Sequence, residues 1–403
     1  MATEAVQNVV VVGAASGGLS VVQSLSKLLP ASHRIVLIEA NPVAFWSIAA
    51  LRAAVLPGFE PQVVHDLSTS SIFGANNTRH VVLAGTRVVD LQEDHIVVDR
   101  DVSSLLSGCE REANGGSKIP VDRVVLAVGA RSVFPTRLEG GAKTKQDVME
   151  QFARMQSDLA AAHEILVLGG GPTGVEFAGE LLDVHPNKKV TLVTRGSGLV
   201  TRGNDRLGGV SNKLIAQLTA KGVRLIFKDS VPLERPTTGP LPTLQTFTTL
   251  NGESITADYI VFASGGKPDT GWIAAIDPTI VDPATGLLTV DPTFSICSPD
   301  ASSRTRWWRY YSVGDSANTP GPKVSYMASQ HAPLLAHNLV SAIKGNGAKL
   351  KHASDSPAEM IMVNVGKGGG AGYLAFVTVG EWITSLFKGR SLHVAMFHKF
   401  FKA

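Results

Sequence analysis

The sequence carries the same short strand, turn and helix pattern twice, and this repeat limits the folds that the chain can adopt. The first copy, "NVVVVGAASGGLSVVQSLSKLL", begins at Asn8, and the second, "EILVLGGGPTGVEFAGELLDV", begins at Glu164. In each copy a β-branched apolar run ends in a glycine-rich turn, and a helical pattern of apolar residues follows. This arrangement opens a Rossmann βαβ unit, so we predict an α/β chain with two dinucleotide-binding units.

The first glycine-rich turn is a degenerate form of the G-x-G-x-x-G pattern. Gly13 permits the tight turn, Gly18 lets the helix pack closely on the strand, and Ala15 places a methyl group where a phosphate should approach. Glu39 follows Gly13 by 26 residues and ends the next strand, where a carboxylate can accept hydrogen bonds from both ribose hydroxyls of an adenosine. The predicted cofactor-binding residues of this unit are Gly13, Ala15, Ser16, Gly17, Gly18 and Glu39.

The second turn keeps all three glycines, and its strand ends differently. Arg195 follows Gly169 by the same 26 residues and is therefore the counterpart of Glu39. A carboxylate there would repel a 2′-phosphate on the ribose, whereas an arginine can pair with one. The predicted cofactor-binding residues of this unit are Gly169, Gly171, Pro172, Thr173, Gly174, Thr194 and Arg195. Two such units usually hold two different dinucleotides, although one of them could be a vestigial scaffold.

Composition excludes several other classes of protein. At 403 residues the chain is long enough for two or three domains, and 18% charged residues, 44% hydrophobic residues and 40 glycines fit a compact α/β protein. A net charge of +3 and the lack of a Lys/Arg cluster argue against a nucleic-acid partner. Cys109 and Cys297 are the only cysteines, without a CxxC pair, so we predict neither disulfides nor a metal site. The first strand begins at Asn8, which leaves no room for a presequence, and we expect a cytoplasmic protein.

Four further segments decide which architecture the repeat belongs to. They are "FWSIAALRAAV" after Glu39, "VDRVVLAVGARSVFP" with Ala127 and Gly129, "DYIVFASGGKPDT" with Gly265, and "YYSVGDSANTPGPKVSYMASQ" with Asp315. In this order and spacing, the segments resemble the apoptosis-inducing-factor-like flavoproteins, and most closely the ferroptosis-suppressor branch. These are single-chain, FAD-dependent NAD(P)H:quinone oxidoreductases related to type II NADH dehydrogenases.

The resemblance implies the domain organisation. An FAD-binding domain would be split by an inserted NAD(P)H-binding domain, and a C-terminal α+β segment would form a lid or interface. The expected limits are 1–132 and 263–342 for the two parts of the FAD domain, 133–262 for the NAD(P)H domain and 343–403 for the C-terminal segment. That segment reads as two strands joined by a glycine-rich turn, followed by a short helix and an aromatic tail.

The resemblance also implies contacts to the flavin. Asp315 would bond the ribityl or pyrophosphate region, with a helix N-cap as the alternative role. A helix starting near Pro322, with Lys323 and Val324, would direct its positive end at the flavin, although Lys323 could be an exposed lysine. Arg52 would face the flavin, and a salt bridge at the edge of the core is the alternative. Ala127 and Gly129 complete the predicted flavin contacts, and Gly265, where the chain re-enters the FAD domain, is a further predicted cofactor-binding residue.

Two charged residues are the candidates for catalysis. Glu176 lies where the resemblance implies a glutamate beside nicotinamide and flavin, and Lys388 could place a cation near the reactive face. A capping glutamate and a solvated lysine are the alternatives, and we expect the nearby Glu180 to be structural. In the tail, Val394 and the phenylalanines 397, 400 and 401 could give weak peripheral contact with a membrane, but we favour packing against the protein itself or a second subunit.

The resulting hypothesis is an enzyme with FAD and NADPH, or NADH, as cofactors. It would take hydride from NAD(P)H onto flavin N5 and pass electrons to a small acceptor, a quinone or oxygen. A biosynthetic oxidase or monooxygenase with a dedicated substrate is one alternative, and a pro-death signalling or DNA-binding flavoprotein is another. The missing CxxC argues against a disulfide reductase. Monomer and homodimer both stay open.

Overall fold

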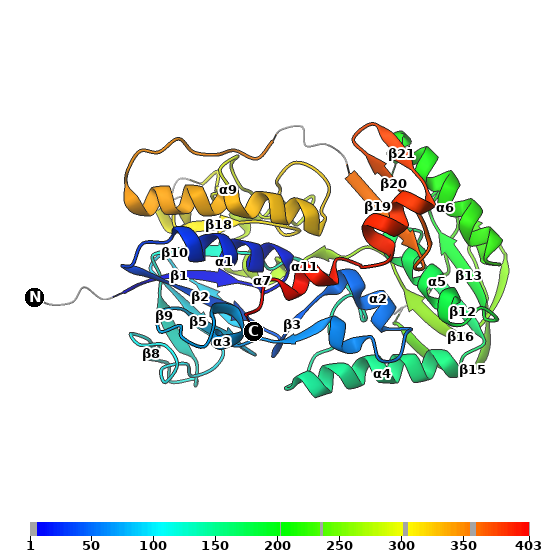
Figure 1. Cartoon of the computed structure of the whole chain (residues 1–403), viewed down its shortest axis with the longest axis horizontal. Helices are drawn as coiled ribbons and strands as arrows, with labels where there is room; N and C mark the ends of the chain where they lie inside the picture. Colours follow the sequence, from blue (N-terminus) through cyan, green and yellow to red (C-terminus); the bar gives the residue numbers. More distant parts are fainter. Residues whose placement is uncertain (1–5, 202, 234–236, 301–304, 355–359, 403) are drawn as a thin grey trace, which may run out of the picture.

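The computed structural model describes residues 6–201, 203–233, 237–300, 305–354 and 360–402, and it contains two five-stranded sheets (Figure 1). The first sheet is parallel throughout, as predicted for a Rossmann unit. In spatial order its strands are β18 (Tyr310–Ser312), β10 (Arg123–Leu126), β1 (Gln7–Val12), β2 (His33–Glu39) and β5 (Val81–Ala84).

Alternate residues of β1 serve two different cores. Val9 and Val11 pack with helices α1 (Ser16–Leu28) and α9 (Ser325–Lys344), which lie side by side in Figure 1. Val10 and Val12 pack toward an antiparallel sheet on the other face. Because both faces are covered, the run of four valines is continuous and does not alternate with polar residues. The covering sheet has the order β6 (Val88–Leu91), β7 (His95–Val98), β9 (Ser117–Pro120) and β8 (Glu110–Arg111), with α7 (Gly271–Ile276) and η4 (Pro278–Ile280) packed beside it.

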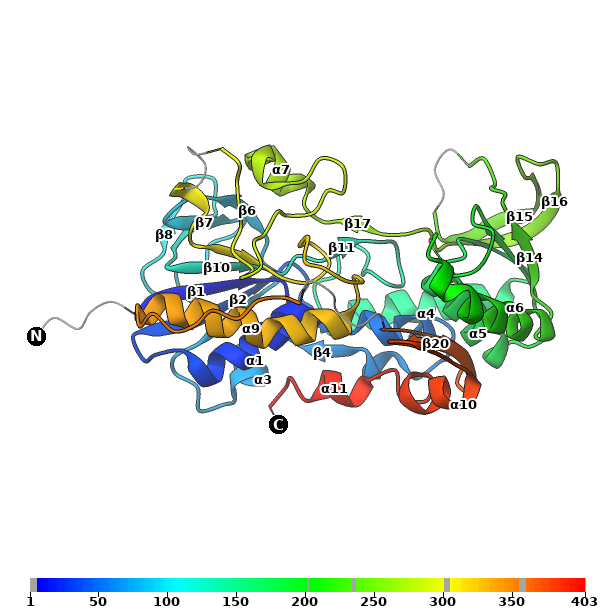
Figure 2. The same ribbon diagram turned by 90° about the horizontal axis from the view of Figure 1, so that it is seen from above.

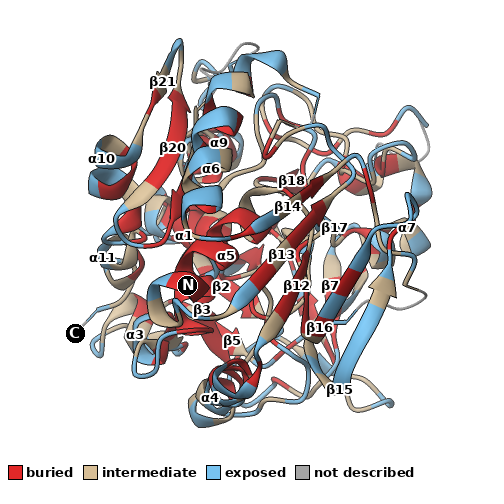
Figure 3. Ribbon diagram, turned by 90° about the vertical axis from the view of Figure 1, so that its right-hand side faces the viewer, coloured by how far each residue is buried: buried red, intermediate tan, exposed pale blue. Residues whose placement is uncertain are grey.

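The second sheet repeats this plan with one antiparallel edge. Its order is β14 (Arg224–Phe227), β13 (Lys189–Thr194), β12 (Glu164–Leu168), β16 (Ser254–Phe262) and β15 (Gly239–Thr248), and only β15 runs antiparallel to its neighbour. Figure 3 shows the largely buried central strands β12 and β13 and, beyond β16, the exposed edge strand β15. One face carries α4 (Lys145–Ala161), α5 (Pro172–Val184) and α6 (Gly208–Ala220), the last preceded by η3 (Asp205–Leu207).

Two short strands connect the halves of the molecule (Figure 2). The chain leaves the first sheet after β10 through β11 (Ala130–Arg131) and returns after β16 through β17 (Lys267–Pro268). These strands pair antiparallel, with Ala130 opposite Pro268. Asp269 accepts hydrogen bonds from Arg131 Nε at 2.6 Å and from Arg137 Nη2 at 2.9 Å, so the crossing is also held by side chains. The first sheet is thus built from strands that precede the second sheet in the sequence and from one strand, β18, that follows it. The expected residue limits of the domains stay predictions.

The C-terminal segment has one more strand than its sequence suggested. It contains β19 (Met360–Val365), β20 (Gly369–Leu374) and β21 (Val377–Val379), of which β19 packs on α5 and β20 on α6. Ala375, with a φ of 57°, breaks the run "GYLAFVTV" into two strands, and a left-handed alanine has no sequence signature. Helix α10 (Glu381–Thr384), the π-helical turn η5 (Ser385–Gly389) and helix α11 (Val394–His398) follow.

Between β2 and β5 the chain makes a compact excursion toward the second half. It comprises β3 (Val43–Phe45), η1 (Ser47–Ala49), α2 (Ala50–Ala53), η2 (Glu60–Gln62), β4 (Val64–Asp66) and α3 (Thr69–Phe73). Helix α2 packs against α5 of the second unit, so this excursion brings residues of the first unit to the second. Within the described residues, no helix combines the length and the apolar character needed to cross a bilayer.

Candidate active site

The glycines of the first turn are required by close backbone approach. Gly13 has a φ of 103°, and a Cβ there would lie 2.4 Å from the carbonyl oxygen of Ala127. A Cβ at Gly18 would lie 1.8 Å from the carbonyl oxygen of Gly13, so a side chain would separate α1 from β1. Gly18 is accordingly absent from the lining of the adjacent cavity, which fits the packing role that the sequence pattern assigns to it.

A cavity of about 900 Å³ lies at the carboxyl ends of the first sheet's strands. Most of the residues predicted to bind the first dinucleotide line it. They are Gly13, Ala15, Ser16, Gly17, Glu39, Ala127, Gly129, Asp315 and Lys323. Val324 does not line the cavity; it is the N-cap residue of α9.

The Glu39 carboxylate is held at the end of β2 by the protein itself. Its Oε2 accepts the Ala14 N–H at 2.7 Å, and its Oε1 accepts the backbone N–H and the side-chain amide of Asn41 at 2.9 and 2.7 Å. A carboxylate has about four lone-pair positions, so one acceptor position is left for a ribose hydroxyl. Its orientation is therefore fixed before any nucleotide binds.

Two helix N-termini converge on the same cavity. The hydroxyls of Ser16, at the start of α1, and Ser325, at the start of α9, lie 3.0 Å apart. Both ends have free N–H groups and the positive end of a helix dipole, which suits a pyrophosphate. Helix α9 begins at Ser325 and not at Pro322 as predicted, because Val324 has an extended backbone with a φ of −141°.

Lys323 is half-buried at the same place and is not the exposed lysine of the alternative interpretation. Its ammonium donates to the carbonyl oxygen of Thr319 at 2.6 Å. Burial lowers the pKa of the Lys323 ammonium, and the nearby Asp315 carboxylate offsets part of this effect. The lysine therefore adds positive charge to the cavity wall beside the start of α9.

The second turn has the same geometry and a more open middle position. A Cβ at Gly169 would lie 2.6 Å from the carbonyl oxygen of Ala263, and one at Gly174 would lie 2.0 Å from that of Gly169. A Cβ at Gly171 would meet nothing within 4 Å, so the backbone there is accessible to a ligand. Pro172 is the first residue of α5, where its missing N–H costs nothing.

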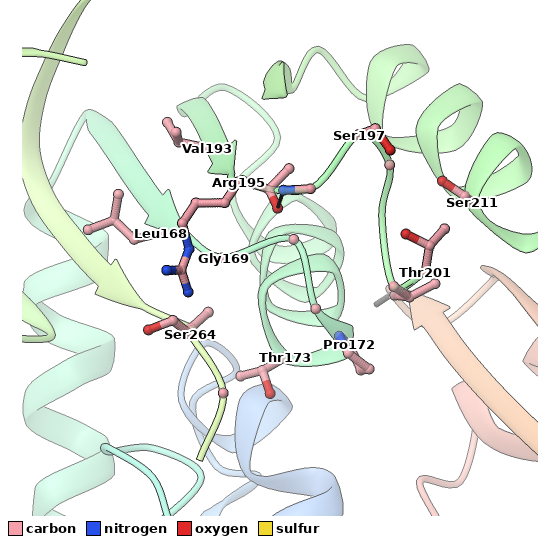
Figure 4. A pocket seen from close by; sticks show the side chains of 18 of the residues that line it. Leu168, Gly169, Pro172, Thr173, Val193, Arg195, Ser197, Thr201, Ser211 and Ser264 are labelled. Atoms are coloured by element: carbon pink, nitrogen blue, oxygen red, sulfur yellow. Dashed lines mark hydrogen bonds between the residues drawn. The ribbon is translucent and has the colours of Figure 1, made fainter. Parts of the chain in front are cut away.

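The second cavity, of about 1210 Å³, contains every residue predicted for the second dinucleotide except Gly174. The lining includes Gly169, Gly171, Pro172, Thr173, Thr194, Arg195 and Gly265. Arg195 is exposed, and Figure 4 shows its guanidinium extending toward Ser264. Asp205 and the buried Asp229 also line this cavity, and the sequence analysis missed both. The signal for Asp229 is its position just after β14, because ligands of parallel sheets bind at the carboxyl ends of strands.

The two cavities meet at the start of α5. Thr173 and Gly266 belong to the lining of both. The two cavities therefore adjoin each other at these two residues.

The candidate catalytic residues Glu176 and Lys388 are brought together, although 212 residues separate them in the sequence. The Lys388 ammonium donates to Glu176 Oε1 and, at 3.0 Å, to the carbonyl oxygen of Met362. Glu176 is 6% exposed. Burial raises the pKa of its carboxyl group, and the Lys388 ammonium offsets part of that rise. Neither residue lines the two cavities; the pair lies one turn along α5 from Thr173.

Arg52 lies in a buried salt bridge and not in the lining of the first cavity. Its Nε and Nη2 donate to the two carboxylate oxygens of Glu180 at 2.8 and 2.7 Å. Its other hydrogen bonds are to the carbonyl oxygens of Gly389 at 2.6 Å and Arg390 at 3.3 Å. This ion pair corresponds to the salt bridge considered as the alternative for Arg52, whereas a contact of Arg52 with the flavin stays a prediction.

The aromatic tail packs against its own chain. Phe397 is fully buried and stacks on Trp46, with 5.3 Å between ring centroids, and Phe401 stacks on His65 at 3.8 Å. This is the arrangement that the sequence analysis favoured over a lipid contact. Large apolar side chains of the C-terminal segment are exposed elsewhere, at Phe376, Val377, Trp382, Leu386 and Phe387.

The first cavity also has walls that the sequence analysis did not predict. Thr86, Arg87, Val88 and Val89 follow β5 directly, and they could have been found from the rule that used Glu39, because β5 is the neighbour of β2. Phe45, the last residue of β3, and Ser47 and Ile48 just after it also line the cavity. The cavity of about 900 Å³ is lined by the starts of two helices and by the fixed carboxylate of Glu39, and so fits a flavin dinucleotide. The open backbone at Gly171 and the start of α5 fit a second dinucleotide.

Comparison with known proteins agrees with this fit. The family model for pyridine nucleotide-disulphide oxidoreductases matches residues 7–332. The chain belongs to this family. Like its relatives, this pyridine nucleotide-disulphide oxidoreductase uses FAD and NAD(P)H.

Individual relatives narrow the position within the family. The chain is 28% identical over 302 residues to the FAD-dependent oxidoreductase FVFD30 of Flammulina velutipes, covering 72% of this chain and 87% of the relative. It is 24% identical over 390 residues to ferroptosis suppressor protein 1 of Homo sapiens, covering 96% and 94%. The sulfide:quinone oxidoreductase of Aquifex aeolicus shares the fold, with a TM-score of 0.66 at 18% identity over 98% of this chain and 90% of that one. The expected flavoprotein architecture is therefore confirmed.

Proposed function

We propose that this oxidoreductase transfers hydride from NADPH, and less readily from NADH, at the junction of its two cavities and passes two electrons to a quinone-like small molecule. The observation that carries this proposal is the shared lining at Thr173 and Gly266, which brings the ends of two nucleotide sites together. FAD, when bound, supplies the atom N5 that accepts the hydride and releases the electrons.

The protein's own contribution is binding and orientation. Glu39, fixed by Ala14 and Asn41, would hold the adenosine ribose of FAD, and the starts of α1 and α9 would hold its pyrophosphate and ring edge. Gly171 and the start of α5 would hold the pyrophosphate of NAD(P)H. Arg195 would pair with the 2′-phosphate of NADPH. Such placement converts a bimolecular reaction into one within a single complex.

Glu176 and Lys388 would serve the acceptor. NAD(P)H gives up two electrons and one proton, and a quinone takes up two electrons and two protons, so the second proton must come from solvent. A buried carboxyl group with a raised pKa can hold that proton and give it to an acceptor oxygen, and the Lys388 ammonium stabilises negative charge developing on that oxygen. Acceptor reduction should therefore be fastest when Glu176 is protonated.

Anaerobic mixing experiments test the proposal. The yellow FAD-loaded protein is mixed with NADPH and with NADH, and the bleaching of the flavin absorbance is followed; the bleached protein is then mixed with a panel of quinones. We expect rapid bleaching, faster with NADPH, and rapid recovery with quinones. If neither nucleotide bleaches the flavin, the proposed reaction is wrong. Recovery only with oxygen would instead favour the oxidase or monooxygenase alternative.

A further inference from the structure

Three hydrogen bonds tie the segment 388–392, here called the strap, to the excursion after β3. Trp46 Nε1 donates to the carbonyl oxygen of Leu392 at 2.9 Å. Arg52 donates to the carbonyl oxygens of Gly389 and Arg390 at 2.6 and 3.3 Å. Trp46 is 1% exposed and Arg52 is 5% exposed, and the bonds to Leu392 and Gly389 are buried, so water competes little for those two carbonyl groups.

Arg52 is itself fixed from the opposite side. Its guanidinium forms the two-pronged salt bridge with Glu180 on α5, and Glu180 Oε1 also accepts the side-chain amide of Asn364 at 2.8 Å. Breaking such a buried ion pair by removing one partner leaves an uncompensated charge in the core. The guanidinium therefore connects a side chain of α5 with two backbone groups of the strap.

The first residue of the strap is Lys388, whose ammonium donates a hydrogen bond to Glu176 on α5, the helix that also carries Glu180. Glu176 and Glu180 are one helical turn apart and lie on one face of α5. The strap is thus held to α5 at two points, by Lys388 through Glu176 and by Arg52 through Glu180. The two points share one short stretch of backbone, so the position of Lys388 depends on the Arg52 contacts.

We propose that Arg52 is a positioning residue for acceptor reduction, which holds the strap against α5 so that Lys388 stays beside Glu176. The inference rests on the proposed function of this pair. It assigns to Arg52 no contact with the reacting groups. Removing it should slow electron delivery to the acceptor and leave hydride uptake from NAD(P)H unaffected, because neither nucleotide cavity is lined by Arg52.

The charges around Glu176 give a test that separates positioning from general stability. The groups that face it are Lys388 from η5, Glu180 from its own helix and, behind Glu180, Arg52 from α2; His393, at the start of α11, lies near Lys388. Arg52→Met leaves Glu180 uncompensated and loosens Lys388, and both changes favour the protonated form of Glu176. Glu180→Gln removes a like charge and keeps an acceptor for Arg52, which favours the ionised form.

The test compares FAD-loaded Arg52→Met, Glu180→Gln and a matched control, Arg123→Met. Like Arg52, Arg123 is a buried arginine paired with a carboxylate, in this case that of Asp122. It lies at the amino end of β10, away from the cavities. For Arg52→Met we expect quinone reduction to fall about tenfold, with flavin bleaching by NADPH within about twofold of the parent. The pH at which quinone reduction has lost half its rate should move up in Arg52→Met and down in Glu180→Gln, each by about one unit.

A second readout does not use activity. Hydrogen exchange at the amides of Arg390 and Leu392, which donate to Ser385 and Lys388, should become faster in Arg52→Met and stay unchanged in Arg123→Met. If Arg52→Met does not fold, Trp46→Phe removes one of the three hydrogen bonds to the strap and keeps an aromatic ring against Phe397. The inference is overturned if Arg52→Met matches Arg123→Met in quinone reduction, pH profile and exchange. Failure of the parent protein to be bleached by either nucleotide would overturn the proposed function instead, and the exchange data would still test the strap contacts.

Discussion

Equivalent positions of the two βαβ units hold residues of opposite charge. Glu39 lies at the end of β2 in the first cavity, and Arg195 follows β13 in the second. A carboxylate accepts hydrogen bonds from ribose hydroxyls, whereas a guanidinium pairs with a phosphate. The acidic residues Asp205 and Asp229 line the same cavity as Arg195, and their negative charge would oppose the binding of a 2′-phosphate. Under the proposed function, Arg195 would therefore favour NADPH, and the two carboxylates in the same cavity would keep that preference moderate.

Replacing Arg195 by glutamate should change that preference. A charge-assisted hydrogen bond contributes about 1.5 to 3 kcal/mol, so we expect Arg195→Glu to raise the KM for NADPH about ten- to a hundredfold and to spare NADH. Steady-state kinetics with both nucleotides measures the ratio. An unchanged ratio would mean that Arg195 does not contact the phosphate.

Removing Lys388 should make stability depend on pH. The pKa of Glu176 is already raised by burial, and Lys388→Met removes the charge that offsets this rise. A group with a raised folded-state pKa binds its proton more tightly in the folded state, so its contribution to stability is present at low pH and is lost as pH rises through that pKa. We expect Lys388→Met to be close to the parent in mildly acidic buffer and to be less stable by about 3 kcal/mol in alkaline buffer. Denaturant unfolding at several pH values checks this.

Among single residues, those that follow the repeated pattern could be predicted from the sequence, whereas the partners of Arg52, Glu176 and Lys388 could not. Glu39, Arg195 and the glycines were found by counting along two copies of one unit. Arg52 was expected to face the flavin, and its ion pair with Glu180 was not foreseen as a specific contact. The two residues are 128 positions apart, and no local pattern records such a partner. Glu176 and Lys388 were named individually, yet their direct contact follows only from the fold.

Among the elements, the second glycine-rich turn uses glycine for two different physical reasons, close packing and space for a ligand. Gly174 has no room for a side chain because the backbone of Gly169 approaches it, and Gly171 has open space where a ligand would lie. The same residue type thus serves packing at one position and binding at the other, three residues apart.

Alanine substitutions should separate these roles. Gly174→Ala should lower the stability of the second unit by more than about 1 kcal/mol, because a Cβ would overlap a carbonyl group. Gly171→Ala should leave the melting temperature unchanged and weaken NADPH binding about tenfold or more, because its methyl group occupies ligand space. Thermal unfolding and nucleotide titration of both variants decide the point, and equal effects of the two substitutions would contradict it.

The boundaries of elements were less predictable than their order. The two βαβ units were found with the strand 164–168 in place, because an apolar run forms the strand and glycines follow its carboxyl end. The start of α9 was misplaced by a few residues, since proline at a helix start competes with the extended preference of the β-branched Val324. The strand β21 was missed because the turn before it depends on the left-handed Ala375.

Across the whole molecule, residues from distant parts of the sequence complete the region around α5. The excursion after β3 supplies Arg52, the second unit supplies Glu176 and Glu180, and the C-terminal segment supplies Lys388. Sequence order and family resemblance gave the layout of the sheets, but the junction of the cavities depends on how the two units pack. No local pattern encodes that packing.

The C-terminal tail should stabilise the molecule through Phe397. Because this ring is fully buried and stacked on Trp46, Phe397→Ala should cost about 3 to 5 kcal/mol. Phe376→Ala is the control, since Phe376 is 89% exposed and its truncation should change stability by less than about 0.5 kcal/mol. Guanidinium unfolding of the two variants measures the difference. A small effect of Phe397→Ala would mean that the packing of the tail on Trp46 contributes little to the free energy of unfolding.

The antiparallel crossing of β11 and β17 has a consequence for how such a chain can be rebuilt. The polypeptide enters and leaves the second unit at neighbouring points, with Ala130 paired to Pro268. A segment whose two ends lie side by side can be excised and replaced without moving the ends of its host. Exchanging the second unit for one with an acidic residue in place of Arg195 would transfer a nucleotide preference in one genetic piece, provided that the new unit keeps Glu176 and Glu180 as partners for Lys388 and Arg52.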